Sequence, residues 1–138
     1  MKSIALLAVA VTMSSGLLFA AAHSEGPMVV AKDQSVANGV VSASMVKADD
    51  NGWLVVHRTD AMMKPGPVVG YAPLRSGDNF DVAAILQESV SSGDMLMLMV
   101  HAEDGGTATG VFEYTLGATE DGPIRMDGEL VMTVITAN

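Results

Sequence analysis

The alternation of apolar and polar positions along this chain predicts a series of short β-strands. Val, Ile, Thr, Met and Leu fill short runs, and Gly, Asp and Asn separate them. This spacing is typical of an antiparallel sandwich or barrel. We expect strands at residues 28–32, 40–47, 53–57, 68–71, 80–86, 95–102, 111–114 and 130–136. The connection 49–52 contains Asn-Gly, a strong hairpin signal.

A helix over 81–92 is the only helical alternative, and Val82, Val90 and the serines near its end disfavour it.

Two of the predicted strands, 53–57 and 95–102, are apolar on both faces. Side chains on a strand alternate between faces, and here one face of each strand ends in histidine. These faces carry Trp53, Val55 and His57 in the first strand, and Met95, Met97, Met99 and His101 in the second. Because a sandwich buries one face of each sheet, the second face needs a cover. A loop, another strand, a second subunit or a partner could supply it.

The first 22 residues have the order of regions of a secretory signal peptide. Lys2 gives a positive start, 4–19 is mostly apolar, and 20–22 is an Ala-Ala-Ala cleavage signal. We therefore expect one exported domain over 23–138, periplasmic or extracellular, with no membrane span after cleavage. A retained membrane anchor is the alternative, although the apolar stretch is short for a span.

Composition excludes several classes of partner and site. The formal charge of −9 would repel nucleic acid and anionic lipid. The absence of Cys excludes disulfides, thiolate metal sites and cysteine nucleophiles. An exported domain without disulfides relies on its core for stability.

Five segments in order resemble a known pattern: 53–60 (WLVVHRTD), 66–86, 95–106, 111–114 (VFEY) and 120–123 (EDGP). Together they resemble an uncharacterised domain of secreted haloarchaeal and bacterial proteins. The resemblance covers roughly residues 33–137. It implies an immunoglobulin-like antiparallel β-sandwich of about seven or eight strands in an exported protein. It implies no activity, and the three methionines depart from the family's pattern.

The Met-His face suits two interpretations. Thioether and imidazole are ligands that favour copper, especially Cu(I). In an immunoglobulin-like sandwich the third and sixth strands are neighbours, so the faces of His57 and His101 would adjoin. Against this, methionine is a flexible core filler, and a stripe of it is more often packing. His23, the first residue after the predicted cleavage, could chelate Cu(II) with its amine and ring nitrogen, or belong to a disordered terminus.

Each strand-end histidine could instead be bonded to a backbone carbonyl or a carboxylate, with Asp60 and Asp104 in matching positions. Zinc is disfavoured because the chain has no closely spaced His pair. Acidic loops at 49–52, 103–106 and 120–122 permit calcium, but none fits a calcium-loop motif.

No nucleophile elbow, acid–base pair or phosphate loop appears, so we expect no enzyme. The leading hypothesis is an exported, non-catalytic interaction module with an unknown protein partner or self-association. The alternative is a periplasmic copper carrier, so we expect either no cofactor or copper.

Overall fold

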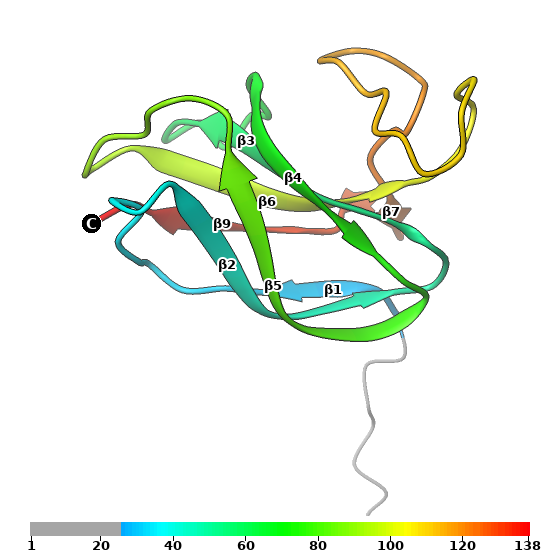
Figure 1. Ribbon diagram of the computed structural model, residues 1–138, viewed down its shortest axis with the longest axis horizontal. Coiled ribbons are helices and arrows are strands. Elements are labelled where there is room, and N and C mark those ends of the chain that lie inside the picture. The colour runs from blue at the N-terminus through cyan, green and yellow to red at the C-terminus, as the bar shows by residue number, and fades with distance from the viewer. Residues whose placement is uncertain (1–25) are drawn as a thin grey trace, which may run out of the picture.

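The computed structural model describes residues 26–138, and that part of the chain is built from strands without helices (Figure 1). The strands are β1 (Met28–Val30), β2 (Val40–Ala48), β3 (Gly52–Thr59), β4 (Val68–Leu74), β5 (Gly77–Leu86), β6 (Met95–Ala102), β7 (Arg125–Met126), β8 (Glu129–Leu130) and β9 (Met132–Thr136). No helix within these residues could cross a membrane.

Seven strands form one antiparallel sheet in the order β1-β2-β5-β4-β3-β6-β9, which curls until its ends approach each other (Figure 1). A bridge between Gln34 and Ala137 joins the chain beyond β1 to the end of β9. Taken as two halves, β1-β2-β5-β4 and β3-β6-β9, the order is that of strands A-B-E-D and C-F-G in an immunoglobulin sandwich. The expected all-β sandwich is confirmed.

The main core lies between the two halves. It takes Leu54 and Val56 from β3, and Leu96, Leu98 and Val100 from β6, all fully buried. Because side chains alternate, the histidines and methionines of these strands point to the opposite, outer face.

Six of the eight predicted strands are confirmed, and 81–86 is strand, not helix. The predicted strand 130–136 is divided at Val131 between β8 and β9. The segment 111–114 is not a strand; it belongs to a long connection between β6 and β7. The small hairpin of β7 and β8 was not predicted. The predicted signal peptide, residues 1–22, lies outside the described residues.

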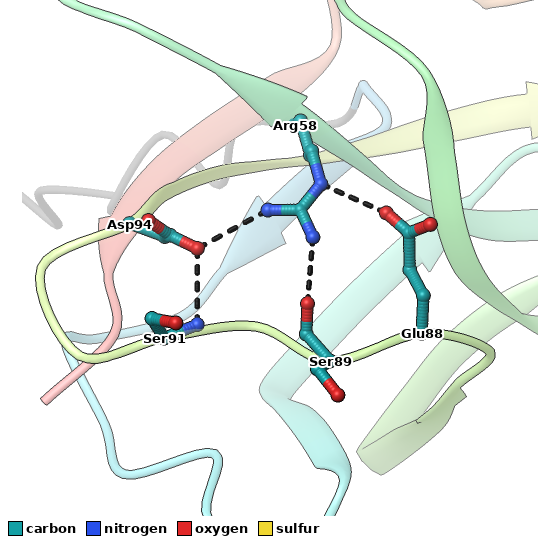
Figure 2. Close-up of polar contacts among 5 residues, drawn as sticks. All are labelled: Arg58, Glu88, Ser89, Ser91 and Asp94. Carbon is teal, nitrogen blue, oxygen red and sulfur yellow. Dashed lines mark hydrogen bonds and ion pairs between the residues drawn. The ribbon is translucent and has the colours of Figure 1, made fainter.

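Arg58, next to His57 in β3, fastens the turn that leads into β6 (Figure 2). Its guanidinium bonds the Glu88 carboxylate at 2.8 Å, the Ser89 carbonyl at 2.7 Å and the Asp94 carboxylate at 3.1 Å. Asp94 also accepts from the Ser91 amide at 3.0 Å. The network fixes the end of β3 relative to the start of β6.

Candidate functional site

β3 and β6 are hydrogen-bonded neighbours, so their outer faces form one surface. In the register, His57 lies opposite Met97, Val55 opposite Met99, and Trp53 opposite His101. The prediction that the two faces adjoin is therefore confirmed. These six residues are all buried, although they lie outside the main core.

The two histidine rings meet on this surface. The Nε2 atoms of His57 and His101 lie 3.2 Å apart, and the ring centroids 5.3 Å. Both residues have 0% exposure. The centroids are farther apart than the Nε2 atoms, so the rings present their Nε2 edges to each other.

Backbone carbonyls fix the opposite side of each ring. His57 Nδ1 lies 2.8 Å from the Gly66 carbonyl oxygen, and His101 Nδ1 lies 2.7 Å from the Asp121 carbonyl oxygen. A carbonyl can only accept, so each Nδ1 carries the hydrogen and donates it. In the neutral tautomers this leaves a lone pair on each Nε2.

The series of three contacts that runs from the Gly66 carbonyl through both imidazoles to the Asp121 carbonyl lacks one hydrogen atom. Three contacts, Gly66 to His57, His57 to His101, and His101 to Asp121, each require one hydrogen. Two neutral imidazoles supply two hydrogens, both used at Nδ1. The Nε2 atoms then oppose lone pair to lone pair, which only a cation between them, a proton or a metal ion, can relieve.

A proton is difficult to hold at this position. Burial lowers the pKa of His57 below its ordinary value. Burial also lowers the pKa of His101 to about 4, and the nearby His57 adds to the effect. At neutral pH both lone pairs are therefore available to a metal.

The cover of the outer face comes from the same chain. The connection 103–124, here called the cover loop, crosses this face and brings Phe112 and Tyr114 onto it. The Tyr114 ring stands edge-on to His101, with centroids 4.5 Å apart, and 5.8 Å from His57. Phe112 packs 4.3 Å from Tyr71 and 5.4 Å from Trp53. The face that was expected to need a cover is thus covered by a loop of the same chain, one of the four alternatives.

Asp121 is the buried residue that fastens the cover loop. Its carboxylate accepts from the Asp104 amide at 3.0 Å and from the Glu113 amide at 2.8 Å. Its own carbonyl orients His101. One residue therefore couples the position of the loop to the orientation of a site histidine.

A surface groove of about 380 Å³ runs between β4 and the cover loop. Its walls include Val68, Tyr71, Tyr114 and the exposed Leu116. Since Tyr114 also contacts both histidine rings, its side chain separates this groove from the buried pair.

The remaining predicted site residues are placed as follows. Met97 and Met99 lie on the face beside the histidines, and Met95 lies one position beyond, opposite Thr59. His23 lies outside the described residues. The sequence predicted that each histidine bonds either a backbone carbonyl or a carboxylate, and the structure confirms the backbone carbonyl.

The hydrogen bonds of the two histidine rings go to each other and to the Gly66 and Asp121 carbonyls, so the role of ring partner suggested for Asp60 and Asp104 does not hold. A capping role holds for Asp60, whose carboxylate accepts from the Met62 amide, whereas Asp104 donates its backbone amide to the Asp121 carboxylate. Within 26–138, no three His, Cys, Asp or Glu side chains, those of the acidic loops included, gather in a way that could hold a metal.

Gly66 and Asp121 are the site residues that sequence reasoning missed. A Cβ on residue 66 would lie 2.7 Å from the Arg58 carbonyl oxygen, so only glycine fits at this position. Glycine thereby allows its own carbonyl group to reach His57. Both residues lie in segments that carried the family resemblance, Gly66 opening 66–86 and Asp121 within the Asp-Gly-Pro turn. Their position in these segments is the feature of the sequence that could have identified them.

The fold and the pair define a small all-β sandwich domain with two buried, facing histidines under a covering loop. Residues 27–138 match the family described as a domain of unknown function, DUF7282, and the chain belongs to this family. The resemblance to an uncharacterised domain is thereby confirmed. Comparisons with curated proteins and with solved structures gave no match.

Proposed function

We propose that this domain is an exported, non-catalytic binding module whose ligand is a transition-metal ion held between His57 and His101. The observation that carries the proposal is the pair of Nε2 atoms, 3.2 Å apart, with both Nδ1 hydrogens committed to carbonyls. Imidazole of this tautomer is the form that binds zinc, copper, nickel and iron.

The surroundings of the pair support metal binding. Histidine ligands in metal sites almost always donate their other ring hydrogen to a carboxylate, a backbone carbonyl or water. Both histidines here do so, to Gly66 and Asp121. The orientation of the ligands is thus set before any ion arrives.

Burial argues for a carrier or store over an enzyme. The pair has 0% exposure, and the Tyr114 ring packs against both imidazoles, an arrangement that suits a small ion better than an organic substrate. The leading hypothesis from the sequence, an interaction module with a protein partner or self-association, rested on an apolar outer face that needs a cover. The cover loop already covers this face, so the face gives that hypothesis less support than it gives metal binding.

The test is a metal titration of the full chain. Competition against chromogenic chelators should give one site for wild type and strong loss for His57→Gln and His101→Gln. His23→Gln is the matched control, because it removes the chain's third histidine and should leave the site intact. A wild-type protein that binds none of Cu(I), Cu(II), Zn(II) or Ni(II) would refute the proposal.

A further inference from the structure

The separation of the two Nε2 atoms constrains the geometry of any ion between them. Imidazole nitrogen binds such ions at about 2.0–2.1 Å, so a linear arrangement would need nitrogens about 4 Å apart. The observed separation is 3.2 Å. It corresponds to a bent arrangement with an angle of roughly 100–110° at the ion. A bent pair leaves the ion incompletely coordinated and calls for a further ligand.

Within residues 26–138 that ligand is not a third imidazole or carboxylate, since no three such side chains gather. Both oxygens of the nearest buried carboxylate, Asp121, accept backbone amides. The Tyr114 hydroxyl faces the Gly117 amide at 3.4 Å. Thioethers are the soft donors that remain on this face.

The strand register identifies one thioether. His57 lies opposite Met97 and His101 opposite Trp53, and the cross-strand pair between these two rows is Val55 and Met99. Rings that reach toward each other from the outer rows must meet over this middle pair. Met99, 1% exposed, is therefore the methionine placed beside the junction of the two Nε2 atoms.

The lack of a carboxylate ligand in this buried site also limits the charge of the ion that can bind. One positive charge between the Nε2 atoms completes the series of contacts described above. A divalent ion would bring a second charge into a buried site with no carboxylate ligand to balance it, which is costly. A monovalent ion avoids that cost, and thioether ligands select Cu(I) among biological metals.

Building on the proposed function, we infer that Met99 is the third ligand of the His57–His101 site and that this ligand set selects Cu(I) over Zn(II). The histidines orient the ion, and the Met99 sulfur supplies the soft donor that zinc does not require. Met95, on the same strand and face but two rows further away, takes no part.

The experiment is an anaerobic competition titration of the full chain with Cu(I) and a chromogenic Cu(I) chelator, run in parallel with Zn(II) and a zinc chelator. Met99→Leu preserves volume and removes the sulfur. It should weaken Cu(I) binding by about tenfold or more, since even the loss of an outer partner costs about 10–100-fold. Met95→Leu is the matched control and should bind Cu(I) as wild type does.

The outcomes separate this inference from the proposed function. If His57→Gln loses Cu(I) while Met99→Leu does not, the histidine site stands and Met99 is not a ligand. If Met97→Leu weakens binding instead, the register argument has chosen the wrong sulfur. Tighter binding of Zn(II) than of Cu(I) by wild type would overturn the selectivity. If nothing binds, the proposed function itself fails.

X-ray absorption at the copper edge provides a readout that a purely structural role of Met99 would not change. The wild-type Cu(I) complex should show sulfur among the nearest scatterers, and Met99→Leu should show nitrogen alone. The wild-type spectrum shows whether a thioether binds the ion even if Met99→Leu does not fold, and the spectrum of Met97→Leu, which should keep the sulfur, shows that the thioether is not Met97. A wild-type spectrum without sulfur would overturn the inference.

Discussion

At the scale of single residues, two carbonyl groups decide the chemistry of the site. Gly66 and Asp121 accept the Nδ1 hydrogens of His57 and His101. Because neither carbonyl can donate, the tautomers are fixed without any carboxylate beside the rings. The residues that make the histidines good ligands are thus backbone positions, which a search for acidic partners overlooks.

Gly66→Ala tests this dependence. The added Cβ would press on the Arg58 carbonyl oxygen and shift the Gly66 carbonyl away from His57. A buried imidazole hydrogen without an acceptor costs about 1–3 kcal/mol. We expect the free energy of unfolding, measured by urea denaturation of the metal-free protein, to fall by this amount, and metal affinity to fall with it. Unchanged stability and affinity would show that the carbonyl is dispensable.

The pH dependence of stability follows from the lowered histidine pKa values. The unfolded chain protonates His101 near its ordinary pKa of 6.5, whereas the folded protein does so only at about 4. The unfolded state therefore binds more protons between these values, and the metal-free fold loses stability as pH falls through this window. Because the unfolded histidine is already half protonated at pH 6.5, the loss from His101 between pH 6.5 and pH 5 is roughly 1–2 kcal/mol.

Urea midpoints of wild type and His101→Gln at both pH values measure this contribution, because carboxylates titrate alike in the two proteins. The free energy of unfolding should fall less on acidification in His101→Gln than in wild type. An equal fall in both proteins would mean that the histidine pair keeps a shared proton in the folded state.

At the scale of elements, the cover loop is the part whose strand-like sequence was misinterpreted. Residues 111–114 alternate in the way a strand does, but no strand edge receives them. Instead the amide of Glu113 bonds the Asp121 carboxylate, and Phe112 and Tyr114 lie on the outer face of β3, β4 and β6. Aromatic contact with an apolar face replaces backbone pairing as the force that holds this segment.

Asp121→Asn should loosen the loop while leaving the sandwich intact. An amide has one accepting oxygen, so one of the two backbone donors, from Asp104 or Glu113, loses its partner. Hydrogen exchange should show faster exchange at these two amides, with the amides of β3 and β6 unchanged. Protection equal to wild type at both positions would contradict the assigned role.

Tyr114→Ala should change the rate of metal exchange more than the affinity. The ring separates the surface groove from the histidine pair, so its removal opens a path for the ion without removing a proposed ligand. Stopped-flow transfer to a chelator should become faster, while Tyr114→Phe, which keeps the ring, should match wild type. Equal rates for all three proteins would place the entry path elsewhere.

At the scale of the whole molecule, a ligand that binds only the folded state stabilises it. Free metal at about 100 times the dissociation constant adds about 2.7 kcal/mol to the free energy of unfolding. For a domain of this size that raises the melting temperature by roughly 10–20 °C. Differential scanning calorimetry should show this shift for Cu(I) with wild type and its reversal by chelator. A variant carrying both His57→Gln and His101→Gln should show none.

The sequence by itself determined the strands of the sandwich, because alternation and turn residues are local properties. It also determined that 53–57 and 95–102 are apolar on both faces, each with a histidine at one end, and that their outer faces need a cover. From the resemblance it placed these strands as neighbours. Those predictions are confirmed by the pairing of β3 with β6 and by the burial of both faces.

Only the tertiary structure decided that the two imidazoles meet edge to edge, because that contact depends on a register between residues 44 positions apart. It also decided that a loop of the same chain is the cover, and that Gly66 and Asp121 orient the rings. These contacts join segments distant in sequence through backbone groups that every residue possesses. The pattern of side chains along the sequence does not indicate these contacts, because they form only when the folded sheet brings the backbone groups and the rings together.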